Sequence, residues 1–175
     1  MCQVAGELAD GVHVHPMHSL HYIHNRLLPS VQKGAERAGR SAQDLDLIVP
    51  VFAIPGDTPE ERAALLQRTR TQLAFYGSTP NYAFQFDDIG FPGTTAKLGK
   101  LMKEGDFGGL AETITDEMID QFAVIARWDD MADKLTERYG EVASRVVMYL
   151  ASESIHRDQT ALSKGGEVAR AVTGG

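Results

Sequence analysis

The side chains best suited to chemistry are concentrated near the amino terminus, where five of the six histidines occur. His13 and His15 are two residues apart, as on one face of a strand. His18, His21 and His24 follow at steps of three, as on one face of a helix. Imidazoles at such spacing can ligate zinc or another transition metal. No acidic residue lies within the span, so we expect pocket-lining and surface histidines and no bound metal.

The residues around this cluster indicate a strand that opens onto a loop. Residues 11–15 (GVHVH) read as a short strand with its valines on one side and its histidines on the other. The loop 15–18 then follows the carboxyl end of that strand, which is where α/β sheets place their active sites. We therefore predict that at least one of His13, His15 or His18 lines a pocket.

A second candidate is the segment YGSTPNY, residues 76–82, which combines two tyrosines, two hydroxyl residues and turn-forming residues. Such side chains can line a ligand groove. The alternative is a helix end followed by a turn, and the Gly and Pro favour this simpler interpretation.

The apolar pattern predicts alternating helices and strands, and hence a parallel sheet with right-handed crossovers. The strongest strand is LDLIVPVFAI, which is apolar nearly throughout, as in a strand buried on both faces. Pro50 within it predicts a bulge or a locally unpaired register, and Pro29 should bend or split the helix that contains it. Helices are expected at 1–10, 19–37, 59–75 and 129–139, strands at 11–15, 45–54, 122–126 and 145–150, and a small helical insertion at about 81–121.

The composition is that of one ordinary globular domain, with 175 residues, 43% hydrophobic and 23% charged. The formal net charge of −7 and the lack of a basic cluster argue against nucleic acid as a partner. No apolar run has the roughly 18 residues of a membrane helix, and the first residues lack a signal-peptide pattern. We expect a cytoplasmic protein.

A family resemblance is carried by five segments: GELADGVHVHPMHS, RLLPSVQKGAERAGR, LDLIVPVFAI, TQLAFYGSTPNY and FAVIARWDDMADKLTERYG. In order and spacing they resemble the luciferase-like flavin/deazaflavin monooxygenase superfamily, and more narrowly its deazaflavin (coenzyme F-420)-dependent oxidoreductases. The resemblance covers about residues 1–150 and implies a partial TIM barrel, its carboxyl-terminal portion. The polar stretch 151–175 is expected to be largely disordered, with a loose helix at 167–172.

The resemblance implies that the carboxyl ends of the strands hold coenzyme F-420, with FMN as the alternative, beside a small organic substrate. His13 would belong to this pocket, and His15, Pro16, Met17 and His18 would lie near the ring or substrate. Tyr76, Gly77 and Ser78 would border the pocket. No catalytic acid or base is assigned.

A whole barrel takes roughly 250 residues, so the resemblance also implies a truncated member that lacks the cofactor phosphate loop and retains the cofactor poorly. Open sheet edges would favour self-association. Two other functions stay open. One is an inactive fragment or paralogue that acts only through association, and the other is a metal-dependent hydrolase using the His13–His24 cluster.

Overall fold

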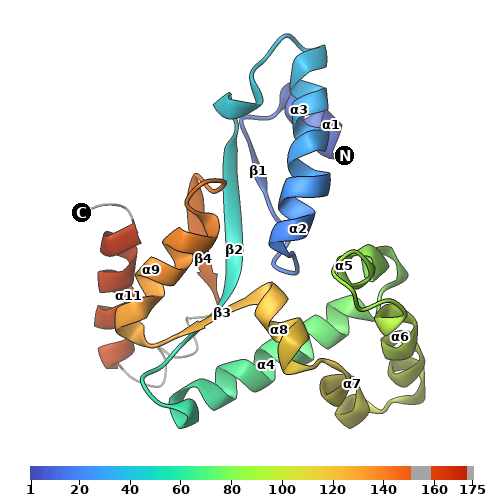
Figure 1. The fold of residues 1–175 in the computed structure, drawn as a ribbon, viewed down its shortest axis with the longest axis vertical. Coiled ribbons are helices and arrows are strands. Elements are labelled where there is room, and N and C mark those ends of the chain that lie inside the picture. Colours follow the sequence, from blue (N-terminus) through green and yellow to red (C-terminus); the bar gives the residue numbers. More distant parts are fainter. Residues whose placement is uncertain (151–158, 173–175) are drawn as a thin grey trace.

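A computed structural model describes residues 1–150 and 159–172, and these form an α/β fold around a four-stranded parallel sheet (Figure 1). The strands are β1 (Gly11–His13), β2 (Asp46–Pro55), β3 (Ala123–Ala126) and β4 (Arg145–Tyr149). The α-helices are α1 (Cys2–Leu8), α2 (Leu20–Tyr22), α3 (Leu28–Arg37), α4 (Pro59–Gly77), α5 (Ala83–Asp87), α6 (Thr94–Glu104), α7 (Phe107–Thr113), α8 (Asp116–Phe122), α9 (Trp128–Tyr139) and α11 (Gln159–Val172). A π-helical segment joins α2 to α3, at Ile23–Leu27, and 3-10 turns lie at Ala42–Asp44 and Pro80–Tyr82. The predicted fold class is confirmed.

Strand β2 is the centre of the sheet, because each of the other strands pairs with it. Ile48 pairs with both His13 of β1 and Arg145 of β4, so β1 and β4 lie on opposite edges of β2. Phe52 likewise pairs with both β4 and β3. Strands β1 and β3 therefore follow one another along one edge, while β4 occupies the other. In a regular barrel consecutive strands are neighbours, so the place of β4 beside β2 is a departure from that order.

The proline in the middle of β2 causes no bulge. Pairing with β4 runs without a break from Val49 through Pro50 to Val51. On the other edge, β1 pairs only as far as Ile48 and β3 begins at Phe52, so Pro50 falls in the gap between them. The predicted bulge is wrong, and the alternative prediction, a locally unpaired register, holds on one edge. A residue without an N–H is tolerated there because that edge has no partner strand at this point.

The two faces of β2 build two separate cores. Val49, Val51 and Ala53 point to one side, where they pack with residues of α3, α9 and α11. Phe52 and Ile54 point to the other side, against α4 and the inserted helices. This alternation is what a strand buried on both faces requires, and it explains why the segment is apolar at nearly every position.

The helix that contains Pro29 continues, but its hydrogen bonding changes just before the proline. Ile23–Leu27 is π-helical, with the Leu28 N–H donating to the Ile23 carbonyl, and Pro29 then lies in the first turn of α3, where a missing N–H costs little. Helix α1 crosses α3 at very close range. A Cβ on Gly34 would meet the Gln3 carbonyl oxygen at 1.9 Å, so only glycine fits there.

The stretch between α4 and β3 is helical, as predicted, and consists of the short helices α5 to α8. The carboxyl-terminal stretch differs from its prediction. Residues 159–172 form helix α11, whose Ala161 and Val168 are buried against the core that includes α9, because alanine and valine recur on one face (Figure 1). The loose helix expected at 167–172 is thus longer and packed, whereas residues 151–158 and 173–175 lie outside the described residues.

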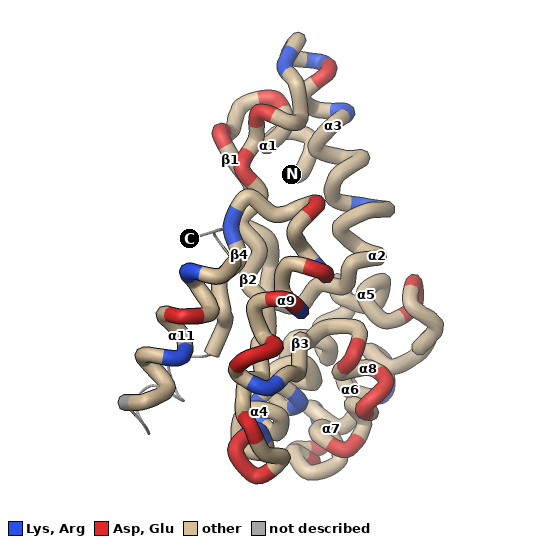
Figure 2. The backbone as a smooth tube through the Cα atoms, turned by 60° about the vertical axis from the view of Figure 1, so that its left-hand side comes forward, with Lys and Arg blue, Asp and Glu red and all other residues tan. Residues whose placement is uncertain are grey.

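Acidic and basic residues are both spread over the described chain, although all charged residues of α8 are acidic (Figure 2). No helix in the described residues combines the length and the apolar composition that crossing a membrane requires.

Candidate functional site

The loop after β1 is held in one conformation by its own hydrogen bonds. The Met17 N–H donates to His15 Nδ1 at 3.1 Å, and the His18 N–H donates to the Pro16 carbonyl at 3.1 Å. His18 Nδ1 lies 2.8 Å from the His15 carbonyl oxygen, so it carries the proton and donates. Since His15 Nδ1 is an acceptor, the neutral ring carries its proton on Nε2. The loop thus fixes both the backbone and the tautomer of His15.

The His15 side chain reaches the end of α4 and the turn after it. Its ring packs edge-on against Tyr76, with centroids 4.7 Å apart, and lies 5.1 Å from the ring of Tyr82. Tyr149, at the end of β4, is close enough to Tyr76 for their hydroxyl groups to interact, which raises the pKa of Tyr149. We call His15, Tyr76, Tyr82 and Tyr149 the aromatic site. It joins the carboxyl ends of β1 and β4, where parallel sheets hold their ligands.

The aromatic site is polar but uncharged at neutral pH. Burial lowers the pKa of His15, which keeps the imidazole neutral. The interaction with the Tyr76 hydroxyl, and then burial, raise the pKa of Tyr149. The site therefore presents ring faces together with a neutral N–H and phenolic O–H groups. Such a surface can stack a planar heteroaromatic ring and donate hydrogen bonds to carbonyl or anionic oxygens.

The other predicted residues lie elsewhere. His13 is exposed on β1 and Pro16 is half-buried, while Met17 is fully buried in the core on the α4 side of the sheet. Gly77 is also buried, because it packs against the ring of Phe86. The Ser78 hydroxyl donates to the Phe75 carbonyl within its own helix end. Of the predicted set, the structure brings together His15 and Tyr76.

His18 lies in the interior, and not at a pocket rim. Its side chain is fully buried, with its ring 5.8 Å from that of Tyr139. Burial lowers its pKa to about 4, and the nearby Arg138 lowers it further, against the hydrogen bond to His15. His18 Nε2 has no hydrogen-bond partner among the described residues. His18 therefore acts on the aromatic site only through the loop that it holds.

The histidine cluster does not assemble a metal site. His21 and His24 are exposed on the helix, and no group of three His, Cys, Asp or Glu side chains in the described residues is placed to hold a metal ion. His15 and His18 each use one ring nitrogen within the loop. This geometry does not favour the metal-dependent hydrolase.

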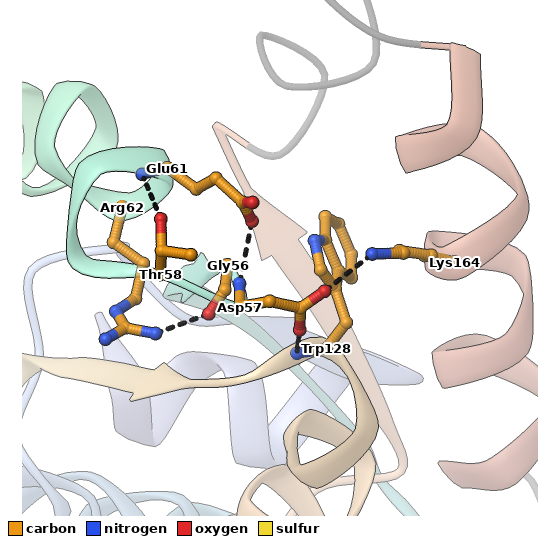
Figure 3. Close-up of polar contacts among 7 residues, drawn as sticks. All are labelled: Gly56, Asp57, Thr58, Glu61, Arg62, Trp128 and Lys164. Carbon is orange, nitrogen blue, oxygen red and sulfur yellow. Dashed lines mark hydrogen bonds and ion pairs between the residues drawn. The ribbon is translucent and has the colours of Figure 1, made fainter.

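A second polar cluster lies at the carboxyl end of β2 and was not predicted from the sequence (Figure 3). The Asp57 carboxylate accepts from the Trp128 N–H at the start of α9, at 3.3 Å, and from Lys164 Nζ of α11, at 2.7 Å. The Asp57 N–H donates to Glu61 at 2.7 Å, while Thr58 caps α4 by accepting from the Glu61 N–H. We call Asp57 and these partners the Asp57 network. The hydrogen bond to Lys164 is the largest effect that lowers the pKa of Asp57.

The Asp57 network ties three helices to the end of β2. Arg62 adds a hydrogen bond to the Gly56 carbonyl (Figure 3). The sequence signal for this cluster is TPEE, residues 58–61, which marks a helix start directly after a buried strand. An acidic residue just before such a start lies at the carboxyl edge of the sheet, and that position identifies Asp57.

The sequence and the fold are similar to those of known proteins. The family model described as luciferase-like monooxygenase matches residues 1–145. The solved structure of the coenzyme F420-dependent tetrahydromethanopterin reductase from Methanopyrus kandleri superposes with a TM-score of 0.63 at 23% identity, over 84% of this chain and 41% of that one. That likeness supports a parallel α/β fold that corresponds to part of a barrel. The chain belongs to the luciferase-like monooxygenase family.

Relatives within the family include one of unknown activity and one named reductase. An uncharacterized protein of Mycobacterium tuberculosis is 35% identical over 147 residues, which are 84% of this chain and 43% of the relative. The 5,10-methylenetetrahydromethanopterin reductase of Methanopyrus kandleri is 27% identical over 150 residues, 85% of this chain and 41% of the relative. The chain thus spans about two fifths of the length of the curated relatives it matches.

Proposed function

We propose that this chain contributes to an oxidoreductase that uses coenzyme F420 on a small organic substrate, and that the aromatic site forms one wall of the cofactor and substrate pocket. The main support for the proposal is the ring contact between His15 and Tyr76 at the carboxyl ends of the strands, in a chain of the luciferase-like family. The F420-dependent reductases among its relatives support F420 as the cofactor. FMN is the alternative.

The aromatic site fits a deazaflavin ring by its chemistry. A deazaflavin is planar and carries ring carbonyl groups, and the site offers tyrosine faces for stacking and the His15 Nε2–H as a donor. When bound, the cofactor supplies hydride chemistry. His15 would orient the ring, and Tyr76 and Tyr149 would exclude water from one side of it.

Titration of the purified chain with F420 and, separately, with FMN tests the proposal. We expect saturable F420 binding by calorimetry, weaker than that of a full-length relative, because the chain spans only part of the matched length. His15→Gln should weaken binding about tenfold, the loss of one hydrogen bond to a ligand in a partly buried site. His13→Gln, on the exposed face of β1, is the matched control and should bind F420 like the unmodified chain.

Two results would contradict this assignment. One is the absence of saturable binding of either cofactor, and the other is an equal effect of the two histidine variants. Binding as tight as that of a full-length relative would instead overturn the idea that the pocket needs more than this chain.

We also propose that the chain self-associates through its sheet. Within the described residues, β1 and β4 each pair only with β2 and leave their second edge unpaired. Unpaired edges template further strand pairing. Sedimentation velocity over a range of protein concentrations should show a mass that rises with concentration, and a constant monomer mass would refute the proposal.

A further inference from the structure

A large cavity lies between α9, β4 and α11, away from the aromatic site. Its volume is about 930 Å³, within the range of roughly 300–1,000 Å³ typical of small-molecule sites. Helices α9 and α11 run side by side along it (Figure 1). No part of the proposed F420 site lines this cavity, so its occupant has to be inferred from its own walls.

The walls of the cavity are mainly apolar. The larger apolar side chains come from all three elements: Trp128, Leu135, Val146, Met148 and Val168. The part of the wall formed by α11 has no side chain at Gly165. A Cβ built on Gly165 would meet no heavy atom within 4 Å, so the open space reaches the helix backbone there. An occupant of this space has an extended apolar body, because polar groups buried among such walls would lose their hydrogen bonds to water.

Two polar groups are left over at the cavity. Tyr139 is a fully buried wall residue whose hydroxyl has no hydrogen-bond partner within the described residues, and the Arg138 guanidinium, 5.8 Å from its ring, opposes the rise in its pKa that burial causes. Arg145, the first residue of β4, is an exposed wall residue and makes no ion pair with any described residue. An apolar cavity with an exposed guanidinium that pairs with none of the described residues complements a ligand that has an apolar tail and one anionic head.

We propose that this cavity binds an amphipathic monocarboxylate with an unbranched acyl chain. The chain would lie among Trp128, Leu135 and Val168, and the carboxylate would pair with Arg145 at the solvent-facing side. The binding requires no chemistry and no cofactor, so it stands or falls separately from the proposed oxidoreductase function.

Trp128 is the only tryptophan of the chain, and it lines the cavity, so its fluorescence reports occupancy. We would titrate the whole chain with octanoate, decanoate and dodecanoate below their micelle concentrations, and follow Trp128 emission together with calorimetry. We expect saturation at one ligand per chain, with affinity that rises about fourfold per added methylene until the cavity is filled. Absence of a saturable fluorescence change with all three acids would overturn the proposal.

Two substitutions separate the head from the tail of the ligand. Arg145→Gln should weaken decanoate binding by up to about fivefold, as expected for an exposed ion pair, and should leave decanol binding unchanged. Gly165→Leu fills the open space beside α11 and should weaken decanoate and decanol alike. Lys97→Gln removes a cation from α6, outside the cavity, and serves as the control for net charge.

Two results with these variants would refute the assignment of the carboxylate ligand to this cavity. If Arg145→Gln weakened decanol as much as decanoate, Arg145 would not be recognising a carboxylate. If Gly165→Leu kept its far-UV circular dichroism and still bound decanoate normally, the ligand would lie outside the cavity. Either result would overturn the proposal, and neither would bear on F420 binding at the aromatic site.

Discussion

The aromatic site and the Asp57 network lie at the carboxyl ends of strands in the same sheet, yet they are built from opposite kinds of interaction. The aromatic site joins neutral rings, and burial keeps His15 uncharged. The Asp57 network joins a carboxylate and an ammonium group, both partly exposed, to the amino terminus of a helix. The first depends on packing and desolvation, and the second on electrostatics that water and salt weaken.

This difference indicates which region is open to a ligand. In the Asp57 network the carboxylate is already satisfied by Lys164 and by the Trp128 N–H, so its charge serves to fasten α11 and α9. In the aromatic site His15 Nδ1 accepts a hydrogen bond within the loop, whereas Nε2 makes no hydrogen bond that involves the loop. The network is therefore structural, and the aromatic site is the region for which perturbation should alter ligand binding.

The largest effect should come from acidifying the loop that supports the aromatic site. The folded pKa of His18, about 4, lies below its ordinary value of 6.5 because of burial, so the unfolded chain takes up the proton first as pH falls. The stability is complete above about pH 6.5 and is lost progressively down to about pH 4, by about 3 kcal/mol. Urea unfolding of the protein at pH 7.5 and at pH 4 measures the loss.

His18→Asn provides the comparison for that measurement. The amide of this asparagine can still donate to the His15 carbonyl but does not titrate. The part of the acid-induced loss of stability that comes from His18 should therefore be absent from the variant. An equal loss in the variant and the unmodified chain would contradict the assignment of the acid sensitivity to His18.

The next effect concerns the packing behind Tyr76. A Cβ at Gly77 would approach Phe86 Cε2 to 2.5 Å, and the Phe86 ring is fully buried and cannot move aside freely. Gly77→Ala should therefore destabilise the protein by about 1–3 kcal/mol, the usual cost of overpacking a core, as measured by thermal unfolding. Gly108→Ala is the matched control, since its Cβ would meet only Asp106 Oδ1 at 3.7 Å. A loss as large in the control would show that the effect is not one of packing.

The smallest effect is expected in the Asp57 network. Asp57→Asn should lower the melting temperature slightly at low salt, and less so at high salt, because the pair with Lys164 is partly exposed and screened. The pKa of Asp57 is lowered in the folded protein, so the contribution of the pair is present at neutral pH and is lost as the carboxyl is protonated at acid pH. A salt-independent change in melting temperature would mean that packing dominates here too.

Much of the fold follows from short-range pattern in the sequence. The apolar run of β2, the Thr58 cap of α4 and the helical insertion at about 81–121 all formed where local rules predict them. The pairing of β4 with β2 could not be predicted in this way. Register between strands far apart in the chain depends on side chains from both, and no local signal specifies it.

The candidate site was predictable only in part, for a related reason. His15 and Tyr76 were both identified from their positions, at a strand end and at a helix end. Tyr149 and Asp57 also lie at or just after the carboxyl end of a strand, but they were not predicted. The sequence around each of them contains no cluster of residues with reactive side chains. His18 and Met17 were misplaced because sequence position gives no direction for a side chain within a tight loop, and here both turn into the interior.

The gap that Pro50 marks along β2 also sets where the site loop begins. Continuing the register of β1 would place residue 15 opposite residue 50, and that rung of the ladder needs N–H groups from residues 50 and 16. Both are prolines, so neither bond can form. The strand has to leave the sheet at this point, and His15 is released to turn toward Tyr76. The lack of a backbone N–H at both Pro16 and Pro50, 34 positions apart in the chain, thus determines that His15 faces the candidate pocket.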